Sequence, residues 1–228
     1  MTHKGVSGNF LKMIALITMT MDHVGLMLFP QCAWLRILGR LAFPLYAYMI
    51  AEGCRHTKSI MRYFGSVTLV GIVCQLVYWF AMGSLYMCIM VTFSLSIALI
   101  ALVKKTEKEK TFPWHLALAA GVVTVFFLCH GLPMLLPDTD FAVDYGFIGV
   151  MLPVLIYLGA TAFSRLALTG VGLCMLALTV GGIQWYSLLA LPLLALYSGK
   201  RGKWKLKWLF YLYYPAHLAI IYALAIIL

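Results

Sequence analysis

Ionisable side chains interrupt two apolar runs near the start of the chain, between residues 11 and 53. Asp22 and His23 stand in the first run, and Arg36 and Arg40 stand in the second. A charged side chain near a bilayer centre costs roughly 2.5–3.5 kcal/mol on insertion scales, so such residues usually face a bundle interior or a wet cavity and mark a functional site. The pattern therefore indicates a polar site between two membrane helices.

A further candidate, His217, lies near the centre of the last apolar run, beside Tyr213, Tyr214 and Pro215. We expect it at about the depth of His23 and Arg40. A lone histidine on an apolar face is usually a core residue, but one beside a proline and two tyrosines at mid-membrane favours function.

This set of side chains matches acyl transfer. A histidine can take the proton of an incoming amine or hydroxyl as general base, and an arginine or a freed backbone donor can stabilise the developing oxyanion. The sequence contains no G-x-S-x-G motif, no nucleophilic Cys/His set and no spacing typical of metal ligands. Direct transfer without a covalent enzyme intermediate, and without a metal, is therefore the simpler hypothesis.

The elements that must position these residues are membrane helices. With 228 residues, 64% hydrophobic and 11% charged, the chain has too little polar surface for a soluble globule, in which the apolar share is about 45–50%. We predict an all-α polytopic membrane protein, a single integral membrane domain over 1–228 with no soluble domain. Spans of about 20 residues are expected near 10–29, 34–51, 62–81, 86–103, 113–130, 146–163, 165–181, 184–198 and 208–227.

A net charge of +10 would suggest nucleic-acid binding in a soluble protein, but the basic residues of this chain cluster in loops and set the orientation of the nine expected spans. Because Lys and Arg are enriched in cytoplasmic loops, their distribution predicts an N-in, C-out protein, with only Arg36 and Arg40 outside the inner segments. The inner residues are Lys4, Lys12, Arg55, Lys58, Arg62, Lys104, Lys105, Lys108, Lys110, Arg165, Lys200, Arg201, Lys203, Lys205 and Lys207.

Helix geometry relates the candidate residues of the first span. Eleven residues at about 100° each make three turns plus about 20°, so Lys12 and His23 share one helix face, about 16 Å apart along the axis. That face can follow one elongated ligand, or Lys12 simply snorkels to the interface. Neighbouring side chains point about 100° apart, so Asp22 is expected to neutralise Arg40 or another residue across the bundle rather than to orient His23.

In the second span, Pro44 lacks the N–H that would bond the carbonyl of Arg40, which predicts a kinked helix with an arginine and a free acceptor at one level. Such a group is tolerated in lipid only where protein or water satisfies it. A purely structural Asp22–Arg40 ion pair is the alternative, and the two interpretations are compatible.

The loops differ in charge. Arg55 to Arg62 (RHTKSIMR) can hold an anionic head group or a cofactor phosphate, but anchoring of topology is the favoured interpretation. The run KKTEKEK is expected to be a solvated loop. The segment after His130 carries Asp138, Asp140 and Asp144 without Lys or Arg and is the expected approach from the outer face. Capping of the following helix is the alternative role of Asp144.

The six cysteines are scattered through apolar segments and are expected to be small core residues. A disulfide among Cys32, Cys88 and Cys129 stays open. The first apolar run is long, carries Asp22 and His23 and lacks an A-x-A-like site, so we expect a retained span rather than a cleaved signal peptide.

Four separated motifs carry a resemblance that covers the chain from end to end. The order LKMIALITMTMDHVG, LRILGRLAFPLYAYMIAEG, DYGFIGVMLP and WLFYLYYPAHL resembles the TraX family of membrane proteins. The family is named for a conjugation protein associated with N-terminal acetylation of pilin subunits at the bacterial inner membrane. It is similar to multi-span acyltransferases that use cytosolic acyl-CoA.

Those acyltransferases often carry a basic residue and a histidine eleven positions apart in the first span. Lys12 and His23 reproduce this spacing, with Lys where Arg is usual. The resemblance implies that His23 is catalytic, that Lys12 and one or both of Arg36 and Arg40 handle acetyl-CoA as co-substrate, and that His217 lines the site. With the polar side chains expected at mid-membrane and the acidic segment after His130, we assign catalysis to His23, Asp22 and His217, donor binding to Lys12, Arg36 and Arg40, and substrate binding to Tyr214 and Asp144.

The expected function is transfer of an acetyl group from acetyl-CoA to an amine or hydroxyl at or across the bacterial cytoplasmic membrane. The acceptor, whether a protein N-terminus, a sugar or a peptide, stays open, and membrane lipids are the other expected partners. The main alternative is a proton-coupled small-molecule transporter, since Asp, His and Arg at mid-membrane also build proton relays; the absence of visible inverted repeats speaks against it. A non-catalytic membrane scaffold is the third interpretation.

Overall fold

The computed structural model describes residues 5–203 and 207–227, which form helices and contain no β-strand. Lys4 and Lys205, both expected in inner segments, lie outside the described residues. The elements, in chain order, are α1 (Gly8–Met27), α2 (Ala33–Gly39), α3 (Ala42–His56), α4 (Ile60–Met82), α5 (Ile89–Glu109), α6 (Phe112–Phe126), the π-helix η1 (Phe127–Gly131), α7 (Leu132–Leu135), α8 (Gly146–Leu158), α9 (Ala162–Val180), the 3₁₀-helix η2 (Gly182–Leu189), α10 (Ala190–Ala195) and α11 (Lys207–Ile227).

The chain divides into two compact units, each formed from helices in mutual contact. The first unit is Met1–Met49 with Gly159–Leu228, and the second is Ile50–Leu158. The division falls inside α3 and again after α8. The expectation of a single domain stays a prediction.

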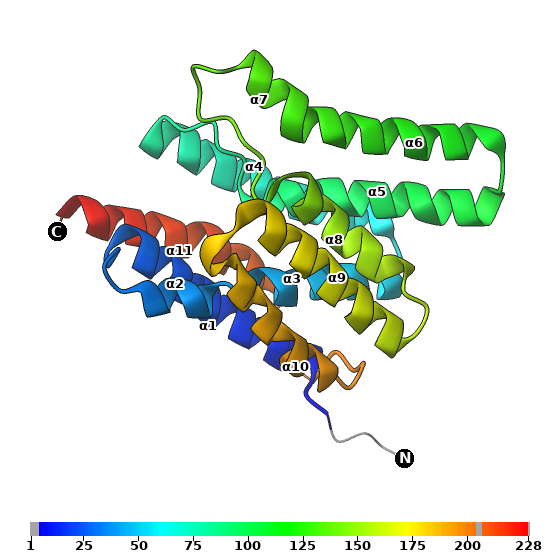
Figure 1. The fold of residues 1–228 in the computed structure, drawn as a ribbon, viewed down its shortest axis with the longest axis horizontal. Helices are drawn as coiled ribbons and strands as arrows, with labels where there is room; N and C mark the ends of the chain where they lie inside the picture. Colours follow the sequence, from blue (N-terminus) through cyan, green and yellow to red (C-terminus); the bar gives the residue numbers. More distant parts are fainter. Residues whose placement is uncertain (1–4, 204–206, 228) are drawn as a thin grey trace. The chain divides into compact units, whose positions relative to one another are not determined.

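In the first unit, α1 packs against both α2 and α11, and α2 also contacts η2 (Figure 1). The pairing of α1 with α11 is parallel, because contacts advance along both helices together: Lys12 meets Phe210, Thr20 meets Tyr213 and His23 meets His217. Two helices that run parallel and both cross a bilayer cross it in the same direction. If both helices cross, the stretch from α1 to α11 makes an odd number of crossings.

In the second unit, α5 contacts α4, α6 and α8 (Figure 1). The segment KKTEKEK is expected to be a loop, but this prediction is wrong, because α5 continues to Glu109. An ion pair between Lys105 and Glu109, four residues apart at 2.9 Å, supports the last turn, and Lys104 donates a hydrogen bond to the carbonyl of Cys54.

Six of the predicted spans coincide with helices long and apolar enough to cross a bilayer: α1, α4, α5, α6 with η1 and α7, α9 and α11. These helices make the chain a multi-pass membrane protein, and the count of nine and the N-in, C-out orientation stay predictions.

The three other expected spans are shorter or broken. The run 34–51 is not one kinked helix but two, α2 and α3, separated by Arg40 and Leu41. Pro44 is consequently the third residue of α3, in a first turn whose N–H groups have no partner within the helix, so its missing donor removes no bond. The run 146–163 gives only the 13 residues of α8, and 184–198 gives most of η2 followed by α10.

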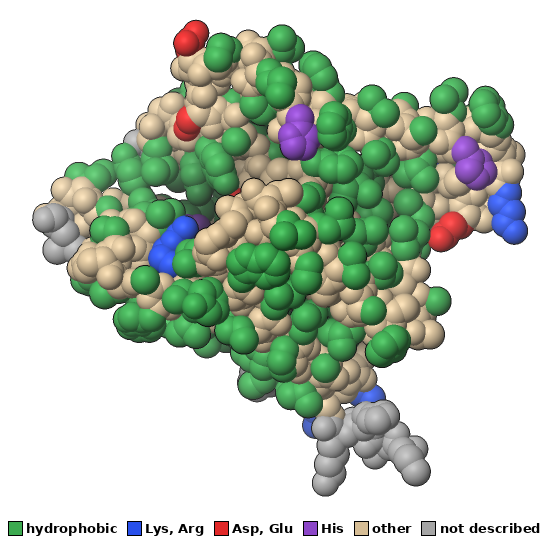
Figure 2. All heavy atoms as spheres, in the orientation of Figure 1, with side chains coloured by type: hydrophobic (Ala, Val, Ile, Leu, Met, Phe, Trp, Pro, Cys, Tyr) green, Lys and Arg blue, Asp and Glu red, His purple; other side chains and the backbone are tan. Residues whose placement is uncertain are grey.

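Apolar side chains dominate the face shown in Figure 2, with few charged groups between them. Phe163, Leu178 and Phe80 are 80%, 73% and 77% exposed, whereas large exposed apolar patches are rare on soluble monomers. This surface fits a lipid environment. All six cysteines are free thiols, and Cys54, Cys74 and Cys88 are buried, as expected of small core residues; the disulfide left open for Cys32, Cys88 and Cys129 is not formed.

Candidate functional site

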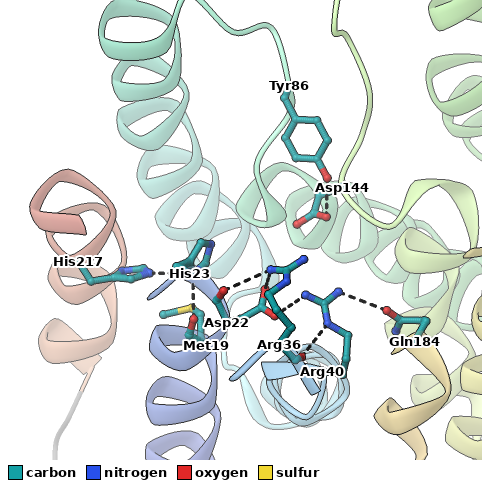
Figure 3. Close-up of polar contacts among 9 residues, drawn as sticks. All are labelled: Met19, Asp22, His23, Arg36, Arg40, Tyr86, Asp144, Gln184 and His217. Carbon is teal, nitrogen blue, oxygen red and sulfur yellow. Dashed lines mark hydrogen bonds and ion pairs between the residues drawn. The ribbon is translucent and has the colours of Figure 1, made fainter. Parts of the chain in front are cut away.

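The site is built on the C-terminal half of α1 (Gly8–Met27), where Asp22 and His23 follow one another. Asp22 turns toward α2, and His23 turns toward α11 (Figure 3). The step of about 100° between neighbouring helical residues produces this divergence. Lys12 shares the α11 side with His23, since its Nζ lies 5.8 Å from the centroid of the Phe210 ring. The shared face predicted for Lys12 and His23 is confirmed.

On the α11 side, His23 and His217 form a pair. Nε2 of His217 lies 3.3 Å from Nδ1 of His23, and the two rings meet edge to face with their centroids 5.0 Å apart. His217 and Tyr214 are buried, at 4% and 3% exposure. The Tyr213 ring stacks on His217 at 5.2 Å, and the Tyr214 ring lies 5.3 Å from it.

The backbone around each ring fixes which nitrogen carries the proton in the neutral pair. Nδ1 of His217 lies 2.9 Å from the carbonyl of Tyr213, and Nδ1 of His23 lies 2.9 Å from the carbonyl of Met19. Carbonyl oxygens only accept hydrogen bonds, so both Nδ1 atoms are donors. The lone pair of each neutral ring is then on Nε2. Nε2 of His217 accepts from the N–H of His23, and Nε2 of His23 remains available as a basic nitrogen.

On the α2 side, Asp22 holds two arginines. Arg36 binds Oδ2 of Asp22 at 2.8 Å, and Arg40 binds Oδ1. These side chains are largely buried: Arg36 is 24% exposed, Arg40 is 12% exposed and Asp22 is 15% exposed. Arg40 also donates to Oε1 of Gln184 on η2 at 3.4 Å. This Asp22 clamp ties α1 to α2 and η2, and it confirms the prediction that Asp22 pairs with Arg40.

Asp144 belongs to the second unit and ends the loop before α8. Its Oδ1 accepts a hydrogen bond from the Tyr86 hydroxyl at 2.8 Å, and its carbonyl accepts one from Thr92 at 2.8 Å. Burial, followed by the Asp144 charge, raises the pKa of Tyr86 above its ordinary value, so the phenol remains a donor. The carboxylate thus has a structural contact of its own, and its role in substrate binding stays a prediction.

The TraX protein family matches residues 7–225, nearly the whole chain and both units. The chain belongs to the TraX family. A probable fimbrial assembly protein, FimC of serogroup H1 from Dichelobacter nodosus, is 24% identical over 92% of either chain. An uncharacterised protein of Rickettsia prowazekii (strain Madrid E) is 45% identical over 40 residues, 18% of this chain and 16% of that protein. No solved structure matches the chain significantly.

In this TraX-family chain, the structure gathers His23, His217, Tyr214, Asp22, Arg36 and Arg40 in one unit, as the sequence predicts. Lys12 lies further along the same face. The sequence reasoning missed Gln184, whose signal was an amide inside the apolar run GGIQWYSLL. It also missed Thr20, whose hydroxyl lies 2.8 Å from that of Tyr213; nothing in the local sequence marked it.

The Asp22 clamp requires glycine at position 39. A Cβ there would lie 2.3 Å from Oδ1 and 2.4 Å from Cβ of Asp22, closer than atoms can approach without displacement. Gly39→Ala is expected to lower the free energy of unfolding by about 1–3 kcal/mol through overpacking, measured by denaturant titration in detergent micelles. Gly65→Ala is the control, because a Cβ at Gly65 in α4 meets no atom within 4 Å and alanine favours a helix by up to about 1 kcal/mol. Equal effects of the two substitutions would contradict the close fit at Gly39.

Proposed function

We propose that this chain is an integral membrane acyltransferase that moves an acetyl group from acetyl-CoA to an amine or hydroxyl acceptor. The observation that carries the proposal is the His23–His217 pair in the first unit. Nδ1 of His23 faces Met19 and His217, at 2.9 and 3.3 Å. Nε2 is thus the nitrogen of His23 that serves as general base.

The reaction needs one proton carrier. The acceptor's nitrogen or oxygen forms a bond to the thioester carbonyl carbon while its proton moves to Nε2 of His23. The tetrahedral intermediate then breaks its carbon–sulfur bond, and the proton on His23 leaves with the sulfur as free CoA. Base catalysis of this kind contributes about 10²–10⁴-fold.

His217 is a positioning residue in this proposal. Its Nε2 accepts from the N–H of His23, which fixes the ring and stabilises the imidazolium that forms when His23 takes the proton. The Tyr213 carbonyl fixes the His217 ring in turn. Asp22 contributes by holding Arg36 and Arg40 beside α1. We propose that those guanidinium groups stabilise the structure around the site and also contact the donor.

We put the N-terminus of a fimbrial subunit first among the proposed acceptors, ahead of a sugar or another peptide, and the name of the relative, a probable fimbrial assembly protein, supports this order. The bacterial cytoplasmic membrane is the proposed location, since acetyl-CoA is made in the cytosol.

The test is release of CoA. Purified protein in nanodiscs receives acetyl-CoA labelled in the acetyl group and a peptide with a free N-terminal amine, and free thiol and label transfer are both followed. We expect thiol release above that of empty nanodiscs. Failure to bind acetyl-CoA, together with proton-coupled flux in proteoliposomes without an acyl donor, would instead establish the transporter.

A further inference from the structure

A second group of side chains in the first unit is unexplained by the chemistry at His23. It lies at the N-terminal end of α1, where the segment after α10 is bound to the start of the helix. Val6 N–H donates to Leu196, Ser198 N–H donates back to Val6, and Gly8 and Asn9 N–H donate to Lys200 and Arg201, at 2.8–3.0 Å. These bonds fix Lys200 and Arg201 beside the first turn of α1.

The approach of this segment to α1 is close. Gly202 has a φ of 96°, and a Cβ on it would lie 2.9 Å from Oγ of Ser7 and 3.1 Å from Cβ of Asn9. Because the α1 N–H groups of Gly8 and Asn9 are already bonded to carbonyls of the segment, the side chains rather than the helix terminus supply the charge here. Asn9, whose N–H binds the Arg201 carbonyl, lies three residues before Lys12, about one turn along α1.

None of these three cations forms an ion pair with a carboxylate among residues 5–203 and 207–227. The sequence of the first unit contains a single acidic side chain, Asp22, which is ten residues or about 15 Å along the helix from Lys12 and is engaged by Arg36 and Arg40. Lys12, the member of the group inside an apolar run, makes no ion pair in the described part of the chain, and its ammonium lies 5.8 Å from the centroid of the Phe210 ring. A group of like charges without counter-ions favours an anionic ligand.

The separation of this group from His23 matches the acyl donor. Lys12 and His23 are about 16 Å apart along one face of α1. In CoA, about twelve bonds join the sulfur to the first phosphate oxygen, the length of about four extended residues, or about 14 Å. A donor with its thioester at His23 and its pantetheine arm along this face places its phosphates at Lys12, Lys200 and Arg201.

We infer that Lys12, Lys200 and Arg201 form the subsite for the phosphate groups of the acyl-CoA donor, an inference that rests on the proposed acyltransferase function. This inference assigns phosphate binding to these three residues rather than to Arg36 and Arg40, which already bind Asp22. The same phosphate chemistry is present in anionic lipid head groups, so the experiment must separate the two sources.

Binding is measured with CoA, 3′-dephospho-CoA and pantetheine on protein in nanodiscs of neutral lipid. Lys200→Gln/Arg201→Gln is expected to weaken CoA binding about tenfold, since a charge-assisted hydrogen bond to phosphate is worth that factor or more. It should weaken 3′-dephospho-CoA less and leave pantetheine unchanged. Lys58→Gln, which removes a cation before α4, is the matched control and should alter none of them.

If the double variant binds CoA as tightly as the unaltered protein, the proposed subsite is wrong. CoA binding by the unaltered protein would still support the acyltransferase. Equal weakening by Lys58→Gln also overturns the subsite, because the effect is then one of net charge. In nanodiscs containing anionic lipid, loss of lipid binding in the double variant with CoA affinity intact assigns the cations to a head group instead. If the unaltered protein binds neither CoA nor pantetheine, the subsite and the acyltransferase fail together.

Discussion

Replacement of His23 by alanine is expected to lower acetyl transfer by about 10²–10⁴-fold. The substitution removes the basic Nε2 nitrogen that the Met19 carbonyl and His217 leave available, and His217, the other described histidine of the first unit, contacts Nδ1 of His23 rather than Nε2. The fold should survive, because the clamp formed by Asp22 lies on a different face of α1. Initial rates of CoA release measure the effect.

The matched control is His130→Ala, which deletes a histidine of η1 in the second unit. It is expected to retain full activity. A His23→Ala protein that unfolds at the same denaturant concentration as the unaltered chain and keeps its rate would exclude His23 as the base.

His217 gives a graded result that separates positioning from packing. His217→Gln places an amide oxygen near the position of Nε2, which still accepts from His23, whereas His217→Ala leaves that N–H with the Met19 carbonyl alone. We expect the alanine variant to lose roughly tenfold or more in kcat, an interaction of about 1–3 kcal/mol, and the glutamine variant to recover most of it. Equal losses in both variants would assign His217 to packing alone.

The first span shows how much local geometry predicts. Helical periodicity places Lys12 and His23 on one face and sends Asp22 to another, and the contacts of Lys12 and His23 with α11 follow that division. Periodicity does not say which helix lies against each face. The parallel packing of α1 on α11, which joins His23 to His217, depends on side chains 194 residues apart.

The second span shows where a local rule misleads. Pro44 predicts a kink in a continuous helix, but the chain ends α2 at Gly39 and restarts at Ala42. Because the helix is interrupted at Arg40 and Leu41, the missing N–H of Pro44 costs no helical hydrogen bond to the Arg40 carbonyl. The interruption also allows Arg36 and Arg40 to bind one carboxylate. Sequence also favours a loop at KKTEKEK, although Lys105 and Glu109 stand at the spacing that stabilises a helix.

Replacement of Asp22 by alanine is expected to have the largest effect on stability, lowering the free energy of unfolding by about 3–5 kcal/mol. The substitution leaves the guanidinium groups of Arg36 and Arg40, only 24% and 12% exposed, without the carboxylate that both now bind. Denaturant titration in detergent micelles, followed by tryptophan fluorescence, measures the loss. Asp138→Ala, in the exposed loop before α8, should change stability by less than about 0.5 kcal/mol.

A double-mutant cycle shows whether Asp22 acts through its arginines. If the clamp is the source of the stability, Asp22→Ala combined with Arg40→Leu should cost less than the sum of the two single changes, by about 1–3 kcal/mol, because the double change removes one of the two guanidinium groups that Asp22→Ala alone leaves without a carboxylate. Strict additivity would show that Asp22 stabilises α1 independently of Arg40. Since His23 lies on another face of α1, the same variants should retain the CoA-binding face, and their residual activity then measures how far the clamp holds the catalytic helix in place.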